Sequence, residues 1–264
     1  MDRAEGVWAV VTGAASGIGR AVACRLAECG YNIFAADRNL QKLHEVRNAI
    51  VLEYGVDVVE YEVDLARWDA AEELFGECCR MELDVRVLVN DAGMFIYNDV
   101  ADTDPQRIDA ILALHVRTVT MLCRLFGARM VSNREGWILN MSSYSIWMPF
   151  PGLTLYSATK AYIKAFSRTF SREMRPCGVK VTAVSPAGVA TDFYGLNPKF
   201  QRLGRRLGVL MTPDRIARIS LRTLFHGRRH KIPGWYYRLL IPLFDVLPDC
   251  FVRFIHRKTS QFRH

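Results

Sequence analysis

Strand-like and helix-like segments alternate along the first 190 residues of this 264-residue chain, and this alternation limits the fold more than any other feature. The strand-like runs are apolar and lack the strict two-residue alternation of a sheet with one wet face. Apolar runs that are each followed by a helical pattern indicate βαβ units, whose crossovers are right-handed. We therefore predict an α/β fold, a single-domain Rossmann-type doubly wound parallel sheet with helices on both faces. The expected strands are Val7–Val11, Tyr31–Ala36, Val56–Val63, Val85–Val89, Trp137–Met141 and Val179–Val184, and the expected helices are Gly17–Cys29, Leu40–Tyr54, Ala70–Met81, Arg107–Met130, Ser157–Met174 and Thr212–Phe225.

A glycine-rich segment, residues 12–19, joins the first expected strand to the first expected helix. Its small residues let the backbone approach a pyrophosphate, and the start of the helix supplies amide groups and the positive end of a dipole. Glycine-rich turns also serve as plain connectors, but this strand-to-helix context is the one that a dinucleotide site requires. The cofactor contacts are expected from Gly13, Ser16, Gly17, Ile18 and Gly19.

Acidic residues follow the second and third expected strands. Asp37 lies about 20 residues beyond the glycines, where a carboxylate accepts hydrogen bonds from the adenosine ribose and repels a 2′-phosphate. This favours NAD as the cofactor. Arg38, the next residue, could instead face a phosphate, so NADP is the second choice. Asp64 and Leu65 close the third strand, which could bring the Asp64 carboxylate near the adenine.

Tyr156 and Lys160 are four residues apart at the start of an expected helix, so their side chains share one face. An ammonium group lowers the pKa of a nearby phenol, which can then donate a proton to a carbonyl oxygen or accept one from an alcohol. Such pairs also occur on plain surfaces. Here, however, Ser143 lies 13 residues before Tyr156 and directly after an expected strand. This places it at the sheet edge where doubly wound folds bind ligands. Its hydroxyl can bond to the substrate oxygen, with Ser142 and Ser145 as alternatives.

The order of these motifs resembles that of a classical short-chain dehydrogenase/reductase from about residue 7 to residue 192. The matching segments are TGAASGIG at 12–19, Asp37, Asp64, NDAG at 90–93, NMSS at 140–143, YSATK at 156–160 and SPAGVAT at 185–191. The resemblance implies that Tyr156 is the acid/base, that Lys160 holds the nicotinamide ribose, and that Ser143 orients the substrate. It also implies cofactor contacts from Asn90, Ala92, Gly93, Tyr156, Lys160, Pro186, Gly188, Val189 and Thr191.

The chain departs from the family pattern at two places near the site. In the long central helix the family often has an asparagine that supports a relay water, whereas this chain has Leu-His-Val at 114–116. His115 is a candidate catalytic residue, because its ring could hold that water or titrate. The alternative is a hydrogen-bonded structural histidine. The usual Pro-Gly is Pro186-Ala187 here, which changes the surface beside the nicotinamide.

The expected activity is that of an NAD(P)-dependent oxidoreductase that moves a hydride between the cofactor and a secondary alcohol or ketone. We divide the chain into a dinucleotide-binding and catalytic core, residues 1–192, and a substrate lid with a basic, aromatic extension, residues 193–264, within one domain. Phe193 and Tyr194 are candidates to face an apolar substrate, with Met148 and Phe150 as the opposite wall. A lipophilic substrate such as a steroid or a long-chain keto lipid would fit these side chains. The alternative is a cofactor-binding scaffold or regulatory protein without turnover.

The net charge of +8 is unevenly distributed. Residues 1–198 hold 20 Lys/Arg and 24 Asp/Glu, whereas residues 199–264 hold 15 Lys/Arg and three acids. This basic part also carries aromatic and aliphatic side chains from Trp235 to Ile255, interrupted by Pro242 and Pro248. Such a composition resembles an interfacial membrane element, so an anionic membrane surface is one expected partner. An oligomer interface or a cover on the lid would use the same composition, and a nucleic-acid partner is not expected because no recognition module is visible.

Cysteine usage and the N-terminal residues indicate the compartment. The seven cysteines include no CxxC and no metal-like spacing, so we expect reduced thiols and no metal site. Residues 1–6 do not resemble a signal peptide, and no run of about 18 uncharged apolar residues is present. These features favour a cytoplasmic protein, peripheral at the inner membrane surface. The family resemblance implies a homodimer or homotetramer formed through the helices near residues 107–130 and 157–174.

Overall fold

A seven-stranded parallel sheet, in the order β3-β2-β1-β4-β5-β6-β7, forms the centre of the molecule. The computed structural model describes residues 6–148, 150–189 and 210–259. The strands are β1 (Trp8–Thr12), β2 (Asn32–Asp37), β3 (Val58–Glu62), β4 (Val85–Asn90), β5 (Gly136–Met141), β6 (Val179–Val184) and β7 (His230–Lys231). The α-helices are α1 (Gly17–Glu28), α2 (Leu40–Tyr54), α3 (Ala70–Arg80), α4 (Pro105–Leu112), α5 (Val119–Ser132), α6 (Thr154–Met174), α8 (Pro213–Phe225), α9 (Trp235–Asp245) and α10 (Asp249–Thr259).

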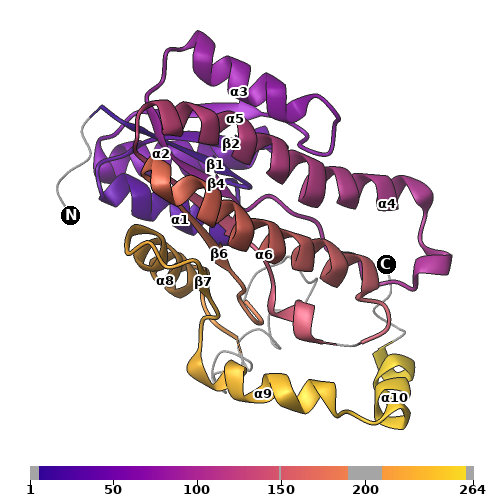
Figure 1. Cartoon of the computed structure of the whole chain (residues 1–264). Coiled ribbons are helices and arrows are strands. Elements are labelled where there is room, and N and C mark those ends of the chain that lie inside the picture. Colours follow the sequence, from indigo (N-terminus) through magenta and orange to yellow (C-terminus); the bar gives the residue numbers. More distant parts are fainter. Residues whose placement is uncertain (1–5, 149, 190–209, 260–264) are drawn as a thin grey trace.

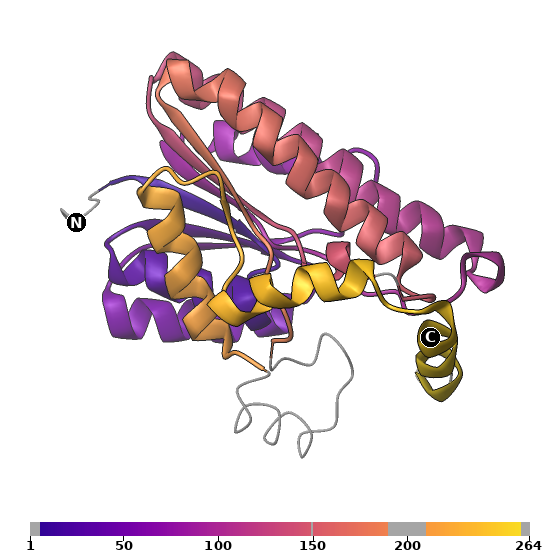
Figure 2. The ribbon, with the colours of Figure 1, turned by 60° about the horizontal axis from the view of Figure 1, so that its bottom comes forward.

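Helices cover both faces of the sheet, as predicted (Figure 1). The hydrophobic cluster on one face includes side chains of α1, α2 and α8, and the cluster on the other includes side chains of α3, α5 and α6. Figure 2 shows these two layers on opposite sides of the strands. The strands β1, β2, β4, β5 and β6 are mostly buried from both sides, which explains their largely apolar character. The prediction of a doubly wound parallel sheet is confirmed.

Polar caps set the starts of several helices. The Asn39 side chain accepts from the amide of Lys42 at the start of α2, and Thr212 accepts from the amide of Arg215 at the start of α8. Proline occupies the first turn of α4 and of α8, where its missing N–H costs no helical hydrogen bond. These local signals place the helix starts close to where the sequence predicts them.

The central helix is longer than predicted, because α4, a π-helical turn η2 (Ala113–Thr118) and α5 form one continuous run. By length and composition alone, this helix, Pro105–Ser132, could cross a membrane. The sequence prediction concerned an uncharged apolar run, and this helix contains Arg117 and Arg124, so the helix does not contradict it. Leu122, Phe126 and Met130 are buried in the cluster that α5 shares with the sheet. Packing against the sheet accounts for the apolar character of this part of the helix.

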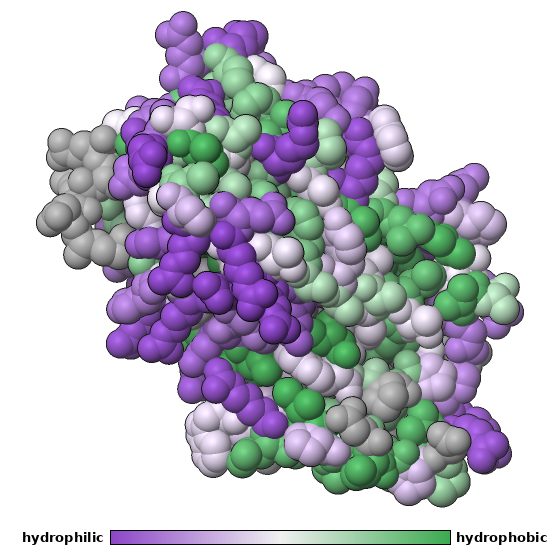
Figure 3. All heavy atoms as spheres, in the orientation of Figure 1, coloured by the Kyte–Doolittle hydropathy of each residue, from purple (hydrophilic) through white to green (hydrophobic). Residues whose placement is uncertain are grey.

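The C-terminal helices lie outside the three layers (Figure 1). The sequence suggested that Pro242 and Pro248 interrupt this region, but α9 continues through Pro242, and of the two prolines only Pro248 lies between α9 and α10. The hydroxyl of Tyr144 donates to the carbonyl oxygen of Tyr237 at 2.6 Å, which ties α9 to the short turn η3 (Tyr144–Trp147). Apolar side chains gather along this edge of the molecule (Figure 3). The proposed boundary at residues 192–193 lies outside the described residues.

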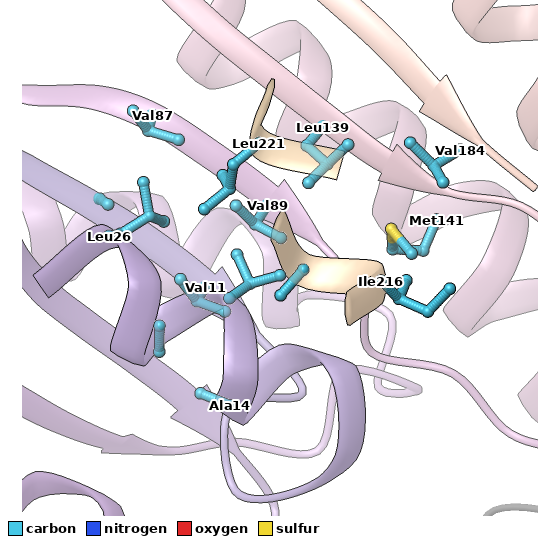
Figure 4. Close-up of a cluster of buried hydrophobic side chains, with 14 of the residues drawn as sticks. Val11, Ala14, Leu26, Val87, Val89, Leu139, Met141, Val184, Ile216 and Leu221 are labelled. Carbon is cyan, nitrogen blue, oxygen red and sulfur yellow. The ribbon is translucent and has the colours of Figure 1, made fainter. Parts of the chain in front are cut away.

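On one face of the sheet, the central strands pack against α1 and α8 through a core of aliphatic side chains (Figure 4). Val11 and Val89 of the central strands, Leu26 of α1 and Ile216 of α8 are all fully buried there. Burying a side chain of this size stabilises the fold by about 1.5–3 kcal/mol. Because this core is built on the central strands, it fixes the positions of the loops that follow them.

Candidate active site

The candidate site lies at the carboxyl ends of the strands, around the point where the strand order reverses. The chain leaves β1 toward β2 on one side, and it returns through β4 on the other side of β1. In doubly wound sheets the crevice at this reversal is where ligands bind. The segments that follow β1, β4, β5 and β6 all carry residues that the sequence predicted for the site.

The glycine loop is held close to the segment that follows β4. Gly13 has a φ of 71°, and a Cβ atom there would lie 2.9 Å from the amide nitrogen of Ala92. A Cβ atom on Gly19 would collide with the carbonyl oxygen of Gly13. Ser16 is the N-cap of α1 and makes no side-chain capping bond. Its hydroxyl therefore does not take up the first amide groups of the helix, which a pyrophosphate could use.

Thr12 joins the two sides of the crevice, a role that the sequence did not single out. Its buried hydroxyl donates to the carbonyl oxygen of Val89 at 3.1 Å. The same oxygen accepts from the amides of Asp91 and Ala92 at 3.1 and 3.2 Å. Thr12 thus fixes the turn after β4 against the end of β1. In the sequence, the position of Thr12 directly before Gly13 is the feature that could have indicated this role.

The carboxylate of Asp37 lies beside the glycine loop. One oxygen accepts from the amide of Ala15 at 3.1 Å, and the other accepts from the amide of Asn39 at 3.1 Å. Arg38 is exposed next to it. Asp64 is also exposed, and Leu65 is buried, with its carbonyl oxygen accepting from Thr118 at 2.8 Å. The structure therefore brings Asp37 to the loop and leaves Asp64 at the surface.

Tyr156, Lys160 and Ser143 are all buried, at 4%, 4% and 5% exposure. The Lys160 Nζ donates to the carbonyl oxygen of Met141 at 3.0 Å and lies 5.9 Å from the centre of the Tyr156 ring. The hydroxyl of Ser142 donates to the carbonyl oxygen of Lys160 at 2.7 Å. These two bonds tie the first turns of α6 to the end of β5 and to Ser142, which directly precedes Ser143. A buried Tyr–Lys pair at this edge is not a plain surface feature.

Ser143 and Ser142 differ in what their hydroxyls do. The Ser142 hydroxyl is committed as a donor to the backbone of α6. The Ser143 oxygen accepts from the amide of Ser145 at 3.1 Å, which leaves its own proton available for another acceptor. Of these two, Ser143 is the better donor to a substrate oxygen. This agrees with the choice made from the 13-residue interval to Tyr156.

His115 is fully buried in the π-helical turn. Its Nε2 accepts from the amide of Met94 at 3.1 Å, so the proton is on Nδ1, which lies 2.9 Å from the hydroxyl oxygen of Thr159. The Thr159 hydroxyl donates in turn to the carbonyl oxygen of Tyr156 at 3.0 Å. Burial, and to a smaller extent the charge of Lys160, lowers the pKa of His115 well below 6.5. A neutral ring with both nitrogens in hydrogen bonds fits the structural alternative better than a titrating one.

Phe95 is a neighbour of Tyr156 that the sequence analysis missed. Its ring centre lies 5.0 Å from that of Tyr156, edge to face, and it stacks on Tyr97 at 6.4 Å. Both residues follow the NDAG segment, and no periodic signal marks them. An aromatic wall beside the phenol suits an apolar substrate.

The other predicted site residues fall into four groups. The backbone carbonyls of Pro186 and Gly188 accept from the amides of Tyr144 and Met211, so both lie in ordered segments beside the site. Met148 and Phe150 are half-buried, and the Phe150 ring lies 6.0 Å from that of Phe244. Further predicted cofactor neighbours lie along the same edge, at Ile18, Asn90, Gly93 and Val189. Thr191, Phe193 and Tyr194 lie outside the described residues.

Asp91 and Lys160 act on each other through their charges. Burial raises the pKa of Asp91 to about 7, and the charge of Lys160 and a hydrogen bond from the amide of Gly19 oppose the rise. Burial lowers the pKa of Lys160, and the charge of Asp91 opposes that fall. An asparagine, the commoner residue at position 91 in the family, would carry no such charge. We therefore expect the stability of the protein to depend on pH near neutrality.

We expect Asp91→Asn to change how stability depends on pH. In the wild type, the pKa of Asp91 is raised by folding. The contribution of Asp91 to the free energy of unfolding is therefore greatest below 3.8, its pKa in the unfolded chain, and is lost as the pH rises to about 7. The asparagine variant does not suffer this loss. Urea unfolding should therefore show that the free energy of unfolding of the variant, relative to that of the wild type, is higher at about pH 8 than at about pH 5 by about 1–3 kcal/mol. An equal difference at both pH values would contradict this account of Asp91.

Comparisons with known proteins agree with this geometry. The sequence profile described as "short chain dehydrogenase" matches residues 7–200. The chain is 34% identical to "Very-long-chain 3-oxoacyl-CoA reductase-B" of Danio rerio, over 90% of this chain and 76% of that protein. It is 32% identical to "Very-long-chain 3-oxoacyl-CoA reductase" of Anas platyrhynchos, over 97% and 80%. Among solved structures, a short-chain dehydrogenase from Sphingobium yanoikuyae in complex with NADPH is similar, with a TM-score of 0.78, 25% identity and coverage of 90% and 92%.

Proposed function

Because the chain belongs to the short-chain dehydrogenase family and is an NAD(P)-dependent oxidoreductase, we propose that it reduces the keto group of a lipophilic substrate, with Tyr156 as the proton donor. The observation that carries this proposal is the buried Tyr156–Lys160 pair, tied to the end of β5 and to Ser142, which directly precedes Ser143. The glycine loop fits the dinucleotide, because side chains at Gly13 or Gly19 would fill the space that the backbone leaves. When bound, the nicotinamide supplies the hydride.

The side chains of the protein orient the substrate, donate the proton and stabilise the phenolate. The Ser143 hydroxyl donates to the carbonyl oxygen of the substrate and orients it. Tyr156 gives its phenolic proton to that oxygen as charge develops there. The Lys160 ammonium stabilises the phenolate left behind, and it also holds the nicotinamide ribose. His115 and Thr159 act as positioning residues, since their hydrogen bonds connect the segment after β4 to the backbone of Tyr156.

A long-chain keto lipid is the substrate class best supported. Two relatives named for very-long-chain 3-oxoacyl-CoA reduction are 34% and 32% identical to this chain. The half-buried ring of Phe95 lies beside the phenol and stacks on Tyr97, which suits an apolar chain at this position. The test is to follow the absorbance of the reduced cofactor with 3-oxoacyl thioesters of increasing length, a 3-ketosteroid and a small water-soluble ketone. Rates that do not rise with chain length would argue against a long-chain substrate.

Asp37 supports NAD rather than NADP as the preferred cofactor. Its carboxylate is beside the glycine loop, where it would repel a 2′-phosphate. A solved short-chain dehydrogenase of the same fold is in complex with NADPH, so NADP is the alternative. We expect NADH to bind at least about tenfold more tightly than NADPH to the wild type, and Asp37→Ser to reduce that ratio to near one. Fluorescence titration of both cofactors measures it, with Asp64→Ser as the control at the exposed position. A wild type that binds NADPH more tightly would reverse the assignment.

The outer side of α5 and α6 is a candidate surface for a second copy of the chain. A shallow, mostly apolar groove between the two helices includes Val131, Phe166 and Phe170. Phe166 stacks on Tyr162 and on Phe170, at 5.8 and 5.2 Å between ring centres. A homodimer or homotetramer formed here would cover these rings. Sedimentation velocity of the purified chain tests this assembly.

We place the protein in the cytoplasm, peripheral at a membrane surface. Residues 1–192 form the catalytic core in this proposal, and residues 193–264 cover the substrate side and carry the excess of basic residues. Fractionation of cells that express the tagged chain tests the location. Recovery in the soluble fraction alone at low salt would contradict membrane attachment.

A further inference from the structure

One face of α9 exposes large apolar side chains to solvent. Trp235, Leu239 and Leu243 are 75%, 68% and 53% exposed, and their four-residue spacing puts them on one side of the helix. Val246, just after the helix, is 72% exposed and continues the row. We name these four residues the outer face of α9. Contiguous apolar surface of this kind marks a site of interaction with a protein or a membrane.

The opposite side of α9 is already used. Tyr237 is buried in the core, and Ile241 and Phe244 pack against it. The Phe244 ring lies 6.0 Å from the rings of both Tyr144 and Phe150. The helix is also tied down by the hydrogen bond from Tyr144 to the carbonyl of Tyr237. Because both sides of α9 are apolar, rotating the helix could not hide the outer face.

The charges around α9 indicate what covers that face. Arg238 on α9 and Arg253 and Arg257 on α10 are exposed. Residues 199–264 hold 15 Lys/Arg against three acids. A second copy placed against this face would bring two strongly basic regions together, which costs free energy. An anionic lipid surface offers the complementary charge together with an apolar layer for the tryptophan and the leucines.

We propose that the outer face of α9 binds the surface of an anionic phospholipid membrane. The arginines meet the lipid headgroups, and Trp235, Leu239 and Leu243 enter the interfacial layer. The inner side of the same helix rests on η3, which directly follows Ser143. The membrane therefore lies on the substrate side of the molecule, and a lipophilic substrate reaches the site from the bilayer. This last step rests on the proposed keto-lipid reduction, whereas the membrane contact does not.

The test compares two matched double variants of the full chain. Leu239→Asp/Leu243→Asp places two charges on the outer face, and Val51→Asp/Leu52→Asp places two charges on the exposed side of α2. Flotation is measured with vesicles of phosphatidylcholine alone and of phosphatidylcholine mixed with phosphatidylserine. We expect the wild type and the α2 variant to float with the anionic vesicles only, and the outer-face variant to bind at least about tenfold more weakly. Added salt should weaken the binding of the wild type.

Several outcomes would overturn the proposal. They are the absence of wild-type binding to anionic vesicles, equal binding to neutral vesicles, and unchanged binding by the outer-face variant. A dimer that only the outer-face charges dissociate, without vesicle binding, would assign this face to a second copy instead. The rate of reduction of a small water-soluble ketone tests the enzymatic proposal independently of membrane binding. The outer-face variant should keep that rate and lose rate only on a keto lipid presented in anionic vesicles.

Discussion

Replacing Tyr156 with phenylalanine should lower kcat for ketone reduction by about 10²–10⁴-fold, because it removes the group that gives a proton to the substrate oxygen. The ring keeps its volume and its edge-to-face contacts with Phe95 and His115, whose centres lie 5.0 and 6.0 Å away. The cofactor cradle, built from the glycine loop and the turn fixed by Thr12, is untouched. The loss should therefore appear in kcat with little change in the Kd of the reduced cofactor.

The measurement is single-turnover reduction under saturating cofactor, with cofactor binding followed by fluorescence. Tyr162→Phe is the matched control, since it removes a phenolic hydroxyl from the next turns of the same helix, where Tyr162 lies 2.7 Å from the hydroxyl of Thr120. That variant should keep a kcat within about threefold of the wild type. A Tyr156→Phe enzyme with wild-type kcat would remove the acid role from this residue. A wild type that binds the cofactor but reduces no ketone would favour a protein without turnover.

The sheet and the cofactor edge could be predicted because their signals are local. Most of the predicted strands are largely apolar runs, with β3, which contains Glu60 and Glu62, as an exception. The loops that follow four of them contain small or polar residues at short range. The limits differ by a residue or two, as in β1, which is Trp8–Thr12 rather than Val7–Val11. Helix α6 starts at Thr154, three residues before the predicted start, so Tyr156 lies inside the helix. Because the strands are parallel, their carboxyl ends lie at one edge of the sheet, so the motif residues that follow them could be placed together from the sequence alone.

Contacts between distant segments could not be predicted in the same way. Strand β7 has two residues and no periodic pattern, and it exists because β6 offers an edge. The π-helical turn that carries His115 replaces an ordinary helical turn, and its hydrogen bonds go to Met94 and Thr159, which are 21 and 44 residues away. The seating of α9 on η3 joins residues 93 apart. Such contacts depend on tertiary packing, which periodicity does not report.

Lys160→Met is expected to have the second large effect, because it removes the charge that stabilises the phenolate. Methionine has a similar length and no charge, so it fills the buried position. Loss of the ammonium should raise the pKa of the phenol, and the pH at half-maximal alcohol oxidation should move upward by about one unit. We expect kcat to fall by about 10²-fold or more at neutral pH, and the Kd of the cofactor to rise because the ribose contact is lost. Rate–pH profiles in both directions, with cofactor titrations, measure these changes.

A control on the same helix separates the role of the charge from that of α6 as a whole. Lys164 lies one turn further along and stacks over the Trp147 ring at 4.3 Å, so Lys164→Met removes an equivalent charge outside the reacting groups. Its pH profile should match that of the wild type. The double variant Tyr156→Phe/Lys160→Met should lose little more kcat than Tyr156→Phe alone, because the ammonium acts through the phenol. Independent losses that multiply in the double variant would mean that Lys160 contributes to turnover mainly by another route, through the cofactor or the backbone of Met141.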